Sequence, residues 1–124
     1  MATSSGDQSP VIVLTTLGAS NDATAFARVL VSERLAACVN VLPPMTSLYW
    51  WKGAVEEDSE RQLVIKTTAD RVAALQARFN ELHPYEVAEF LVVRVSEGSA
   101  AYLGWLVDSL AAAAPPGRGG TERS

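Results

Sequence analysis

A pair of long strand-like stretches in the middle of the chain, residues 39–52 and 53–67, limits the folds that are open to it. Only Lys52-Gly53, a pair typical of a tight turn, separates them, so they predict one hairpin. Each arm is more than twice the usual strand length of about 5–6 residues. Pro43-Pro44 interrupts the first arm, as prolines do at a sheet edge or a bulge. The hairpin should therefore extend beyond the body of so small a protein.

Three aromatic residues in a row, Tyr49, Trp50 and Trp51, stand near the end of this hairpin. Side chains alternate along a strand, so Trp50 and Trp51 should face opposite sides. Large apolar side chains on both faces of an exposed ribbon favour association, and aromatic residues are enriched at interfaces. We therefore predict that Tyr49, Trp50 and Trp51 are interface residues of an obligate oligomer. The alternative is that one tryptophan belongs to the core and the other simply lies on the surface.

The rest of the chain shows alternating strand and helix patterns around this hairpin. A β-branched run at 11–16 predicts a central strand buried on both faces, and Ser20, Asn21 or Asp22 can cap the next helix. Asp70 or Thr68 can cap the second helix, which Pro84 ends. The predicted elements are a strand at 11–16, a helix at 23–37, the hairpin, a helix at 70–83, a strand at 87–95 and a last helix that opens at Gly98-Ser99. The order β-α-β-β-α-β plus a C-terminal helix predicts a ferredoxin-like α+β fold.

The composition predicts one soluble domain, residues 10–113, with flexible tails at 1–9 and 114–124. The net charge is −4 and no Lys/Arg cluster is present, which argues against nucleic acid or an anionic membrane as partner. No apolar run reaches the roughly 18–20 residues that span a bilayer, and the N-terminus does not have the pattern of a secretory signal. A single cysteine, Cys38, permits no internal disulfide, and we therefore expect a cytoplasmic location.

The only histidine, His83, stands directly before Pro84-Tyr85. It is either a helix-terminal residue that gains from the helix dipole or a ligand for Cu(II), Zn or Ni, with Glu86 or Glu89 as oxygen partners. Cys38 is expected to be a buried, unreactive thiol, the alternative being a Cu(I) ligand or a nucleophile. The acidic run 56–58 is expected to be a solvated strand edge rather than a calcium loop. No nucleotide-binding, redox or nucleophile-elbow motif is present, so catalysis is not expected.

Four segments, "ERLAACVNVLP", "SLYWWKGAVEEDSERQLVIKTT", "LHPYEVAEF" and "AYLGWL", resemble the signature segments of the CutA divalent-cation-tolerance family in order and spacing. The resemblance covers roughly residues 11–110. It implies a ferredoxin-like trimer whose long hairpins wrap neighbouring subunits, with an architecture similar to that of PII-type signalling proteins. It also implies a cytoplasmic homotrimer linked to tolerance of divalent metals, with copper the ion usually named, and it implies no reaction.

Three positions depart from the family pattern. Family members described as copper binders carry a cysteine late in the first strand, where this chain has Thr15, and a second histidine where it has Leu82. The proline that usually precedes the glutamate of the His-Pro-Tyr segment is Ala88 here. Of the three copper-ligand positions that the resemblance implies, only His83 remains.

Three further residues in the matching segments, Lys66, Tyr85 and Glu89, are candidates for an inter-subunit cleft that binds a small anion or metabolite. The alternative is an ordinary ion pair and a tyrosine whose hydroxyl is hydrogen-bonded. Two functions therefore stay open. The first is a homotrimeric divalent-cation-tolerance protein that binds or responds to copper or another divalent ion, with His83 as its metal contact. The second is a PII-like interaction or sensor module that binds a small ligand or a protein at its clefts and no metal.

Overall fold

The structure is a computed structural model that describes residues 6–111 of the 124-residue chain. The predicted tails lie largely outside this range, as do residues 112 and 113 at the end of the predicted domain. Asp7 and Ser9, which the sequence assigns to the N-terminal tail, accept backbone hydrogen bonds of 2.8 and 2.9 Å from Asp70 and Ala69. The elements run in the order β1 (Pro10–Gly18), α1 (Ala23–Ser32), β2 (Cys38–Trp51), β3 (Ala54–Thr68), the 3-10 helix η2 (Ala69–Arg71), α2 (Val72–Leu82), β4 (Leu91–Arg94) and α3 (Ala100–Leu110).

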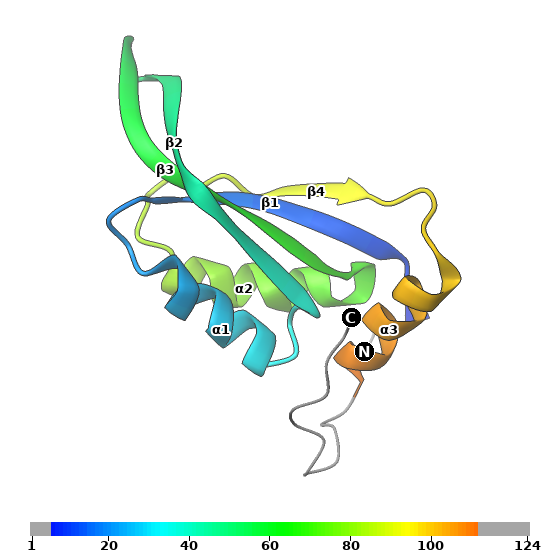
Figure 1. The fold of residues 1–124 in the computed structure, drawn as a ribbon. Coiled ribbons are helices and arrows are strands. Elements are labelled where there is room, and N and C mark those ends of the chain that lie inside the picture. The colour runs from blue at the N-terminus through cyan, green and yellow to red at the C-terminus, as the bar shows by residue number, and fades with distance from the viewer. Residues whose placement is uncertain (1–5, 112–124) are drawn as a thin grey trace.

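The strands form one four-stranded sheet in the order β2-β3-β1-β4, and all three neighbouring pairs are antiparallel. Helices α1 and α2 lie side by side under one face of this sheet, and α3 lies at one end of it (Figure 1). This is the ferredoxin-like α+β fold with an additional C-terminal helix, as the sequence predicts.

The core lies between the sheet and the two helices α1 and α2. Odd-numbered side chains of β1 and β3, such as Val13, Leu63 and Ile65, are fully buried there, because alternate residues of a strand share one face. They pack with residues of the helices, among them Leu30 and Leu75. Each such side chain contributes roughly 1.5–3 kcal/mol by leaving water.

The opposite face of the sheet carries apolar side chains that no element within residues 6–111 covers fully. In the register of the strands, Ile12 lies opposite Val93 and Leu14 lies opposite Leu91. Ile12 and Leu14 are only half-buried, and Leu91 is 54% exposed. The expectation that the first strand is buried on both faces is therefore wrong for the single chain. We call this surface, formed by Ile12, Leu14, Leu91 and Val93, the open sheet face.

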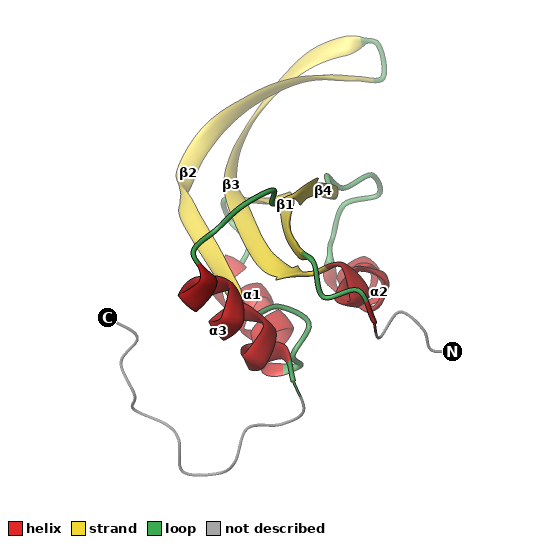
Figure 2. Cartoon of the chain, turned by 90° about the vertical axis from the view of Figure 1, so that its right-hand side faces the viewer, coloured by secondary structure: helices red, strands yellow, loops and turns green. Residues whose placement is uncertain are grey.

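The predicted hairpin is confirmed. A register shift between Val41 and Pro44 marks the bulge at the two prolines. Lys52 and Gly53 both have positive φ, 51° and 84°, which is the signature of a type I′ turn, a turn whose twist matches that of the flanking strands. The far half of the hairpin extends beyond the sheet and curls over its end (Figures 1 and 2).

The first helix is shorter than the sequence predicts, because α1 ends at Ser32 rather than near residue 37. Arg34 takes a left-handed conformation with φ of 61°. The N–H of Leu35 then reaches back to the carbonyl of Leu30, and the N–H of Arg34 to that of Val31, each at 3.0 Å. This is a Schellman motif, which ends the helix and still returns Leu35 to the core.

Two other predicted boundaries differ. Neither Thr68 nor Asp70 caps α2, because the 3-10 turn η2 precedes that helix and no side chain caps either start. The fourth strand has only the four residues Leu91–Arg94 instead of 87–95. The cap predicted for the first helix is confirmed at Asp22, which accepts from the N–H of Ala25. Ser99, at the predicted start of the last helix, accepts from the N–H of Tyr102.

Candidate binding groove

A groove lies between the curled hairpin, the end of β1 and the loop that follows α2. Its volume is about 1230 Å³. Its walls include the rings of Tyr49, Trp50, Trp51 and Tyr85 and the carboxylates of Asp58, Glu60, Glu86 and Glu89. Figure 2 shows the curl of β2 and β3 from which the groove results. None of the described residues that line it is a lysine or an arginine, so the groove is acidic and aromatic.

The loop that forms one wall follows α2 and ends where β4 begins. Strand β4 pairs with β1 only as far as Leu14, so the outer edge of β1 from Thr15 onward has no strand beside it. The imidazole of His83 occupies this edge, with Nε2 2.7 Å from the carbonyl oxygen of Thr16. Because the ring takes this edge, the chain after His83 pairs with β1 only from Leu91 onward.

Both ring nitrogens of His83 are engaged. The backbone N–H of Tyr85 donates to Nδ1 at 3.1 Å, so Nδ1 must carry a lone pair. The carbonyl of Thr16 can only accept, so Nε2 must carry the proton. The arrangement assigns the neutral Nε2–H tautomer. The ring also packs against Phe79 and Tyr85, with 4.8 Å between centroids in each case.

The hydroxyl of Tyr85 donates to the Glu60 carboxylate across 3.2 Å. Glu60 is only 7% exposed, which is unusual for an acidic residue. Burial first, and then the negative charge of Glu60 and its hydrogen bond to the phenol, raise the pKa of Tyr85 above its ordinary value of 10.0. Tyr85 is therefore held protonated as a donor at the floor of the groove.

Two further polar pairs complete the lining. The side-chain amide of Gln62 donates to Glu89 at 3.0 Å and to the carbonyl of Thr15 at 2.6 Å. On the hairpin, the hydroxyl of Tyr49 donates to Asp58. This hydrogen bond is the main cause that raises the pKa of Tyr49 to about 12.

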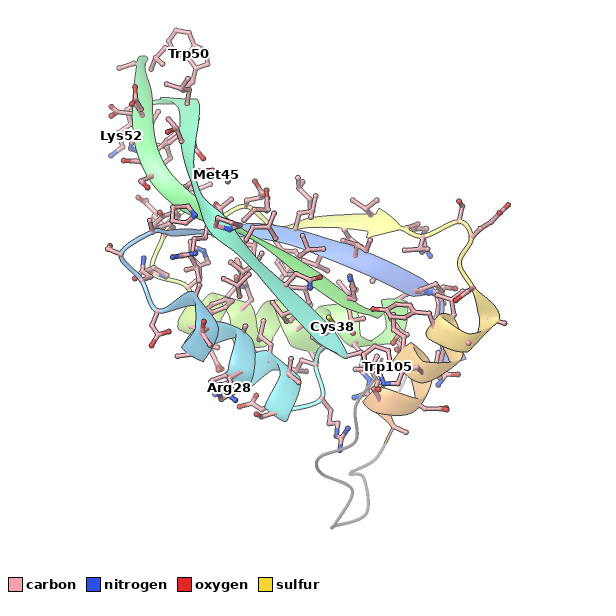
Figure 3. All side chains as sticks on the ribbon, in the orientation of Figure 1. Arg28, Cys38, Met45, Trp50, Lys52 and Trp105 are labelled. Carbon is pink, nitrogen blue, oxygen red and sulfur yellow. The ribbon has the colours of Figure 1, made fainter. Side chains whose placement is uncertain are left out.

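The predicted cleft residues are only partly brought together. Tyr85 and Glu89 line the groove, whereas Lys66 does not. Lys66 pairs with Ile12 and Cys38 in the sheet, and its Nζ lies 5.8 Å from the ring centroid of Tyr102. Cys38 is half-buried at the start of β2 (Figure 3).

The sequence reasoning missed Glu60 and Gln62 as groove residues. It placed the acidic residues of the second hairpin arm on a solvated edge. Glu60 and Gln62 share the parity of Asp58 on one strand, which puts all three on one face, but their contacts are with Tyr85 and Glu89 of the loop after α2, which is distant in sequence.

The metal ligands implied by the sequence do not converge within one protomer. No group of three His, Cys, Asp or Glu residues suited to hold an ion is found between residues 6 and 111. Thr15, at the family's cysteine position, is fully buried, and its hydroxyl has no hydrogen-bond partner in the described structure. Leu82 packs against the core. Glu86 and Glu89 line the groove, but the lone pair of His83 is already used.

The hairpin tip exposes large apolar side chains. Trp50 is 74% exposed and Leu48 67% exposed, and both lie on the same strand as Trp51. Figure 3 shows Trp50 at the far end of the hairpin, away from the body of the protein. The Nζ of Lys52 lies 5.5 Å from the ring centroid of Trp51. Within the described residues, no helix is both long and apolar enough to cross a membrane.

The chain matches the family model described as CutA1 divalent ion tolerance protein over residues 11–109. It is 45% identical over 95 residues to the divalent-cation tolerance protein CutA of Thermus thermophilus, covering 77% of this chain and 92% of the relative. It is 48% identical over 90 residues to a CutA homolog of Xenopus laevis, covering 71% of this chain but only 60% of that longer protein.

Solved structures agree with this similarity. The divalent cation tolerance protein of Thermus thermophilus superimposes with a TM-score of 0.77 at 43% identity, covering 81% of this chain and 97% of the other. A structure from Archaeoglobus fulgidus, described as a periplasmic divalent cation tolerance protein, shares the fold with a TM-score of 0.78 at 24% identity, covering 82% of this chain and 99% of that one.

Proposed function

The chain belongs to the CutA1 divalent ion tolerance family, and from this premise we propose that it acts as a homotrimer in the response to divalent cations. The observation that carries the assembly is the apolar surface that a single protomer leaves uncovered. It consists of the open sheet face and the tip of the hairpin with Leu48, Trp50 and Val55.

Exposed apolar surface of this extent is unfavourable in a monomer and marks an association surface. Trp50 and Trp51 are neighbours on one strand and so point to opposite sides, which means that the ribbon needs cover on both faces. The hairpin extends beyond the sheet, and the helices of residues 6–111 lie under the sheet or at one end of it, away from the hairpin tip (Figure 1). Sister subunits supply that cover in the proposed trimer.

Light scattering coupled to size-exclusion chromatography tests the assembly. The expected mass is three times the 13.2 kDa of the chain. Trp50→Ser should shift the population toward smaller species, whereas Arg28→Ser, on the exposed side of α1, should not. A folded wild-type monomer at micromolar concentration would refute the trimer.

The role of metal in this proposal is limited by the geometry of the groove. One of the two interpretations of the sequence is direct binding of Cu(II) or another divalent ion by His83 with Glu86 or Glu89. Within one protomer such a site would require His83 to give up its hydrogen bond from Tyr85 or to Thr16. We therefore propose that the response to cations does not depend on an ion held by His83. Isothermal titration calorimetry with Cu(II) and with Zn(II) on wild type and on His83→Asn tests this proposal. We expect the two proteins to give the same result. Metal binding that is present in wild type and lost in His83→Asn would show that His83 is a ligand.

A second candidate function is favoured by the groove itself. It is large enough for a small ligand, and its floor offers a tyrosine hydroxyl and two carboxylates, Glu60 and Glu89. We propose a PII-like module in which this groove, bounded by neighbouring subunits, binds a small molecule or a protein segment. A thermal-shift screen would detect such a ligand, since binding to the native state raises the melting temperature with concentration.

We propose a cytoplasmic location, because the chain has one cysteine and no possible internal disulfide. We assign no reaction to the protein. The net charge of −4 is the reason why neither nucleic acid nor an anionic membrane is proposed as partner.

A further inference from the structure

We infer that His83 is a positioning residue: its neutral ring ties the backbone of β1 to the loop after α2 and thereby fixes the Tyr85 hydroxyl against Glu60 at the floor of the groove. This inference rests on the proposed role of the groove as the functional surface. It assigns to the single histidine a task other than metal ligation.

The first step is the fixed orientation of the ring. Its two partners are both backbone groups, the carbonyl of Thr16 at 2.7 Å and the N–H of Tyr85 at 3.1 Å. One accepts and the other donates, so only one neutral tautomer satisfies both. The ring cannot rotate freely either, because Phe26 and Phe79 pack against it with centroids 6.0 and 4.8 Å away.

The second step leads from the ring to the phenol. Pro84 fixes one backbone dihedral between the two residues, and the hydrogen bond from the Tyr85 N–H to Nδ1 fixes the next peptide. The ring of Tyr85 then lies 4.8 Å from the imidazole, with an interplanar angle of 69°. From this position its hydroxyl reaches Glu60 on β3, which ties the loop to the base of the hairpin.

The third step is the consequence for cations. A metal ion on Nδ1 would take the lone pair that accepts from the N–H of Tyr85. An ion on Nε2 would displace the proton that is hydrogen-bonded to the carbonyl of Thr16, and the neutral ring would then carry its proton on Nδ1, which could no longer accept from Tyr85. Either event leaves a backbone group without its partner and frees the tyrosine. Coordination by His83 would therefore disassemble the groove floor instead of completing it.

The test uses the fact that the chain has one histidine. In protein labelled with ¹⁵N-histidine, long-range proton–nitrogen spectra report one ring without assignment. We expect the Nε2–H tautomer near neutral pH, and we expect both nitrogen shifts to remain in place when Zn(II) chloride is added to one equivalent per subunit. An Nδ1–H tautomer, or a nitrogen shift that saturates with Zn(II), would overturn the inference.

Variants test the positioning itself through the titration of Tyr85. In wild type this phenol should ionise above its ordinary range, and Tyr85→Phe identifies its signal among the three tyrosines. His83→Ala should bring the midpoint closer to 10, because the loop no longer holds the phenol buried and beside Glu60. His83→Asn, which offers an oxygen near the place of Nδ1, should restore most of the wild-type midpoint. An unchanged midpoint in His83→Ala would refute the positioning role.

The oligomeric state of the same samples separates this inference from the proposed function. A wild-type monomer by light scattering removes the trimer but leaves the tautomer measurement valid. If His83→Ala does not fold, the nitrogen spectrum of the wild-type protein still tests the inference. It shows whether the ring has the Nε2–H tautomer and whether its nitrogen shifts stay unchanged when Zn(II) is added.

Discussion

A β-carbon placed on Gly18 would lie 3.0 Å from the hydroxyl oxygen of Tyr85. Gly18 is the last residue of β1, and the absence of a side chain there creates the niche that receives the phenol. The same β-carbon would lie 3.1 Å from the amide nitrogen of Asn21. The hydroxyl that donates to Glu60 therefore depends on a glycine in a different element of the chain.

Replacement of Gly18 by alanine should destabilise the protein by about 1 kcal/mol in free energy of unfolding. The added methyl group must displace Tyr85 or Asn21, and off-position packing of this kind costs roughly 1–3 kcal/mol. A gain of roughly 0.4–1 kcal/mol partly offsets this loss, because alanine lowers the conformational entropy of the unfolded chain relative to glycine. Urea denaturation at fixed protein concentration measures the difference.

The matched background is Tyr85→Phe, which lacks the hydroxyl. In that background the added methyl group meets only the Asn21 amide, so Gly18→Ala should cost less than in wild type, and the double-mutant cycle should show a coupling of roughly 0.5–1 kcal/mol between positions 18 and 85. Equal effects of Gly18→Ala in both backgrounds would mean that the niche does not accommodate the phenol.

The turn at the hairpin tip offers a second prediction. Both Lys52 and Gly53 have positive φ, which costs a residue other than glycine or asparagine roughly 1 kcal/mol or more. Lys52→Asn should therefore raise the free energy of unfolding by a few tenths of a kcal/mol, whereas Gly53→Ala should lower it by about 1 kcal/mol. Thermal unfolding followed by circular dichroism checks both, and the same sign for the two substitutions would contradict the turn assignment.

The hydrogen bond from Tyr49 to Asp58 predicts a loss of stability in alkaline solution. It raises the pKa of Tyr49 to about 12, above the ordinary value of 10.0 that applies to the unfolded chain. Between these pH values the native state binds the Tyr49 proton more tightly than the unfolded chain does. The contribution of the Tyr49–Asp58 hydrogen bond to the stability of the native state is therefore complete below pH 10 and disappears as the pH rises through about 12. Absorbance of tyrosinate against pH should show one phenol near pH 12 that is missing in Tyr49→Phe. Ionisation of all three tyrosines near pH 10 would contradict the pairing.

The order of the elements could be read from the sequence because it depends on local patterns. The spacing of apolar residues in α2, the Lys52-Gly53 turn and the proline after His83 all act within a few residues. The end of α1 could not be read in this way. Leu35 continues the apolar pattern of the helix, yet it reaches the core through a left-handed Arg34 whose side chain donates to the carbonyl of Ser109 in α3, at 2.7 Å.

The groove was harder to predict, for a related reason. Its key pairs, Tyr85 with Glu60 and Gln62 with Glu89, join residues 25 and 27 positions apart. They meet because β3 pairs with β1 at Gly18 and Thr16 while the loop after α2 lies along the other edge of β1, and no local pattern encodes that meeting. The short fourth strand has the same origin, since the ring of His83 takes the edge of β1 that a longer strand would have paired with.

The open sheet face gives the sharpest test of the assembly, because two neighbouring valines on β4 differ in the face they occupy. Val93 lies opposite Ile12 and belongs to the open face, whereas Val92 lies opposite Val13 and shares the parity of the helix-covered face. The two are almost equally exposed in the protomer, 46% and 45%, so a lysine at either position should have a similar, small effect on a monomer.

In the proposed trimer the two substitutions should diverge. Val93→Lys would place a charge where a sister subunit covers the sheet, and the lost burial alone costs roughly 1.5 kcal/mol per subunit, about tenfold in the association constant for each. Val92→Lys should leave the assembly close to wild type. Sedimentation velocity over a dilution series measures both, and trimers that resist dilution equally in the two variants would show that the open sheet face is not the surface on which the subunits meet.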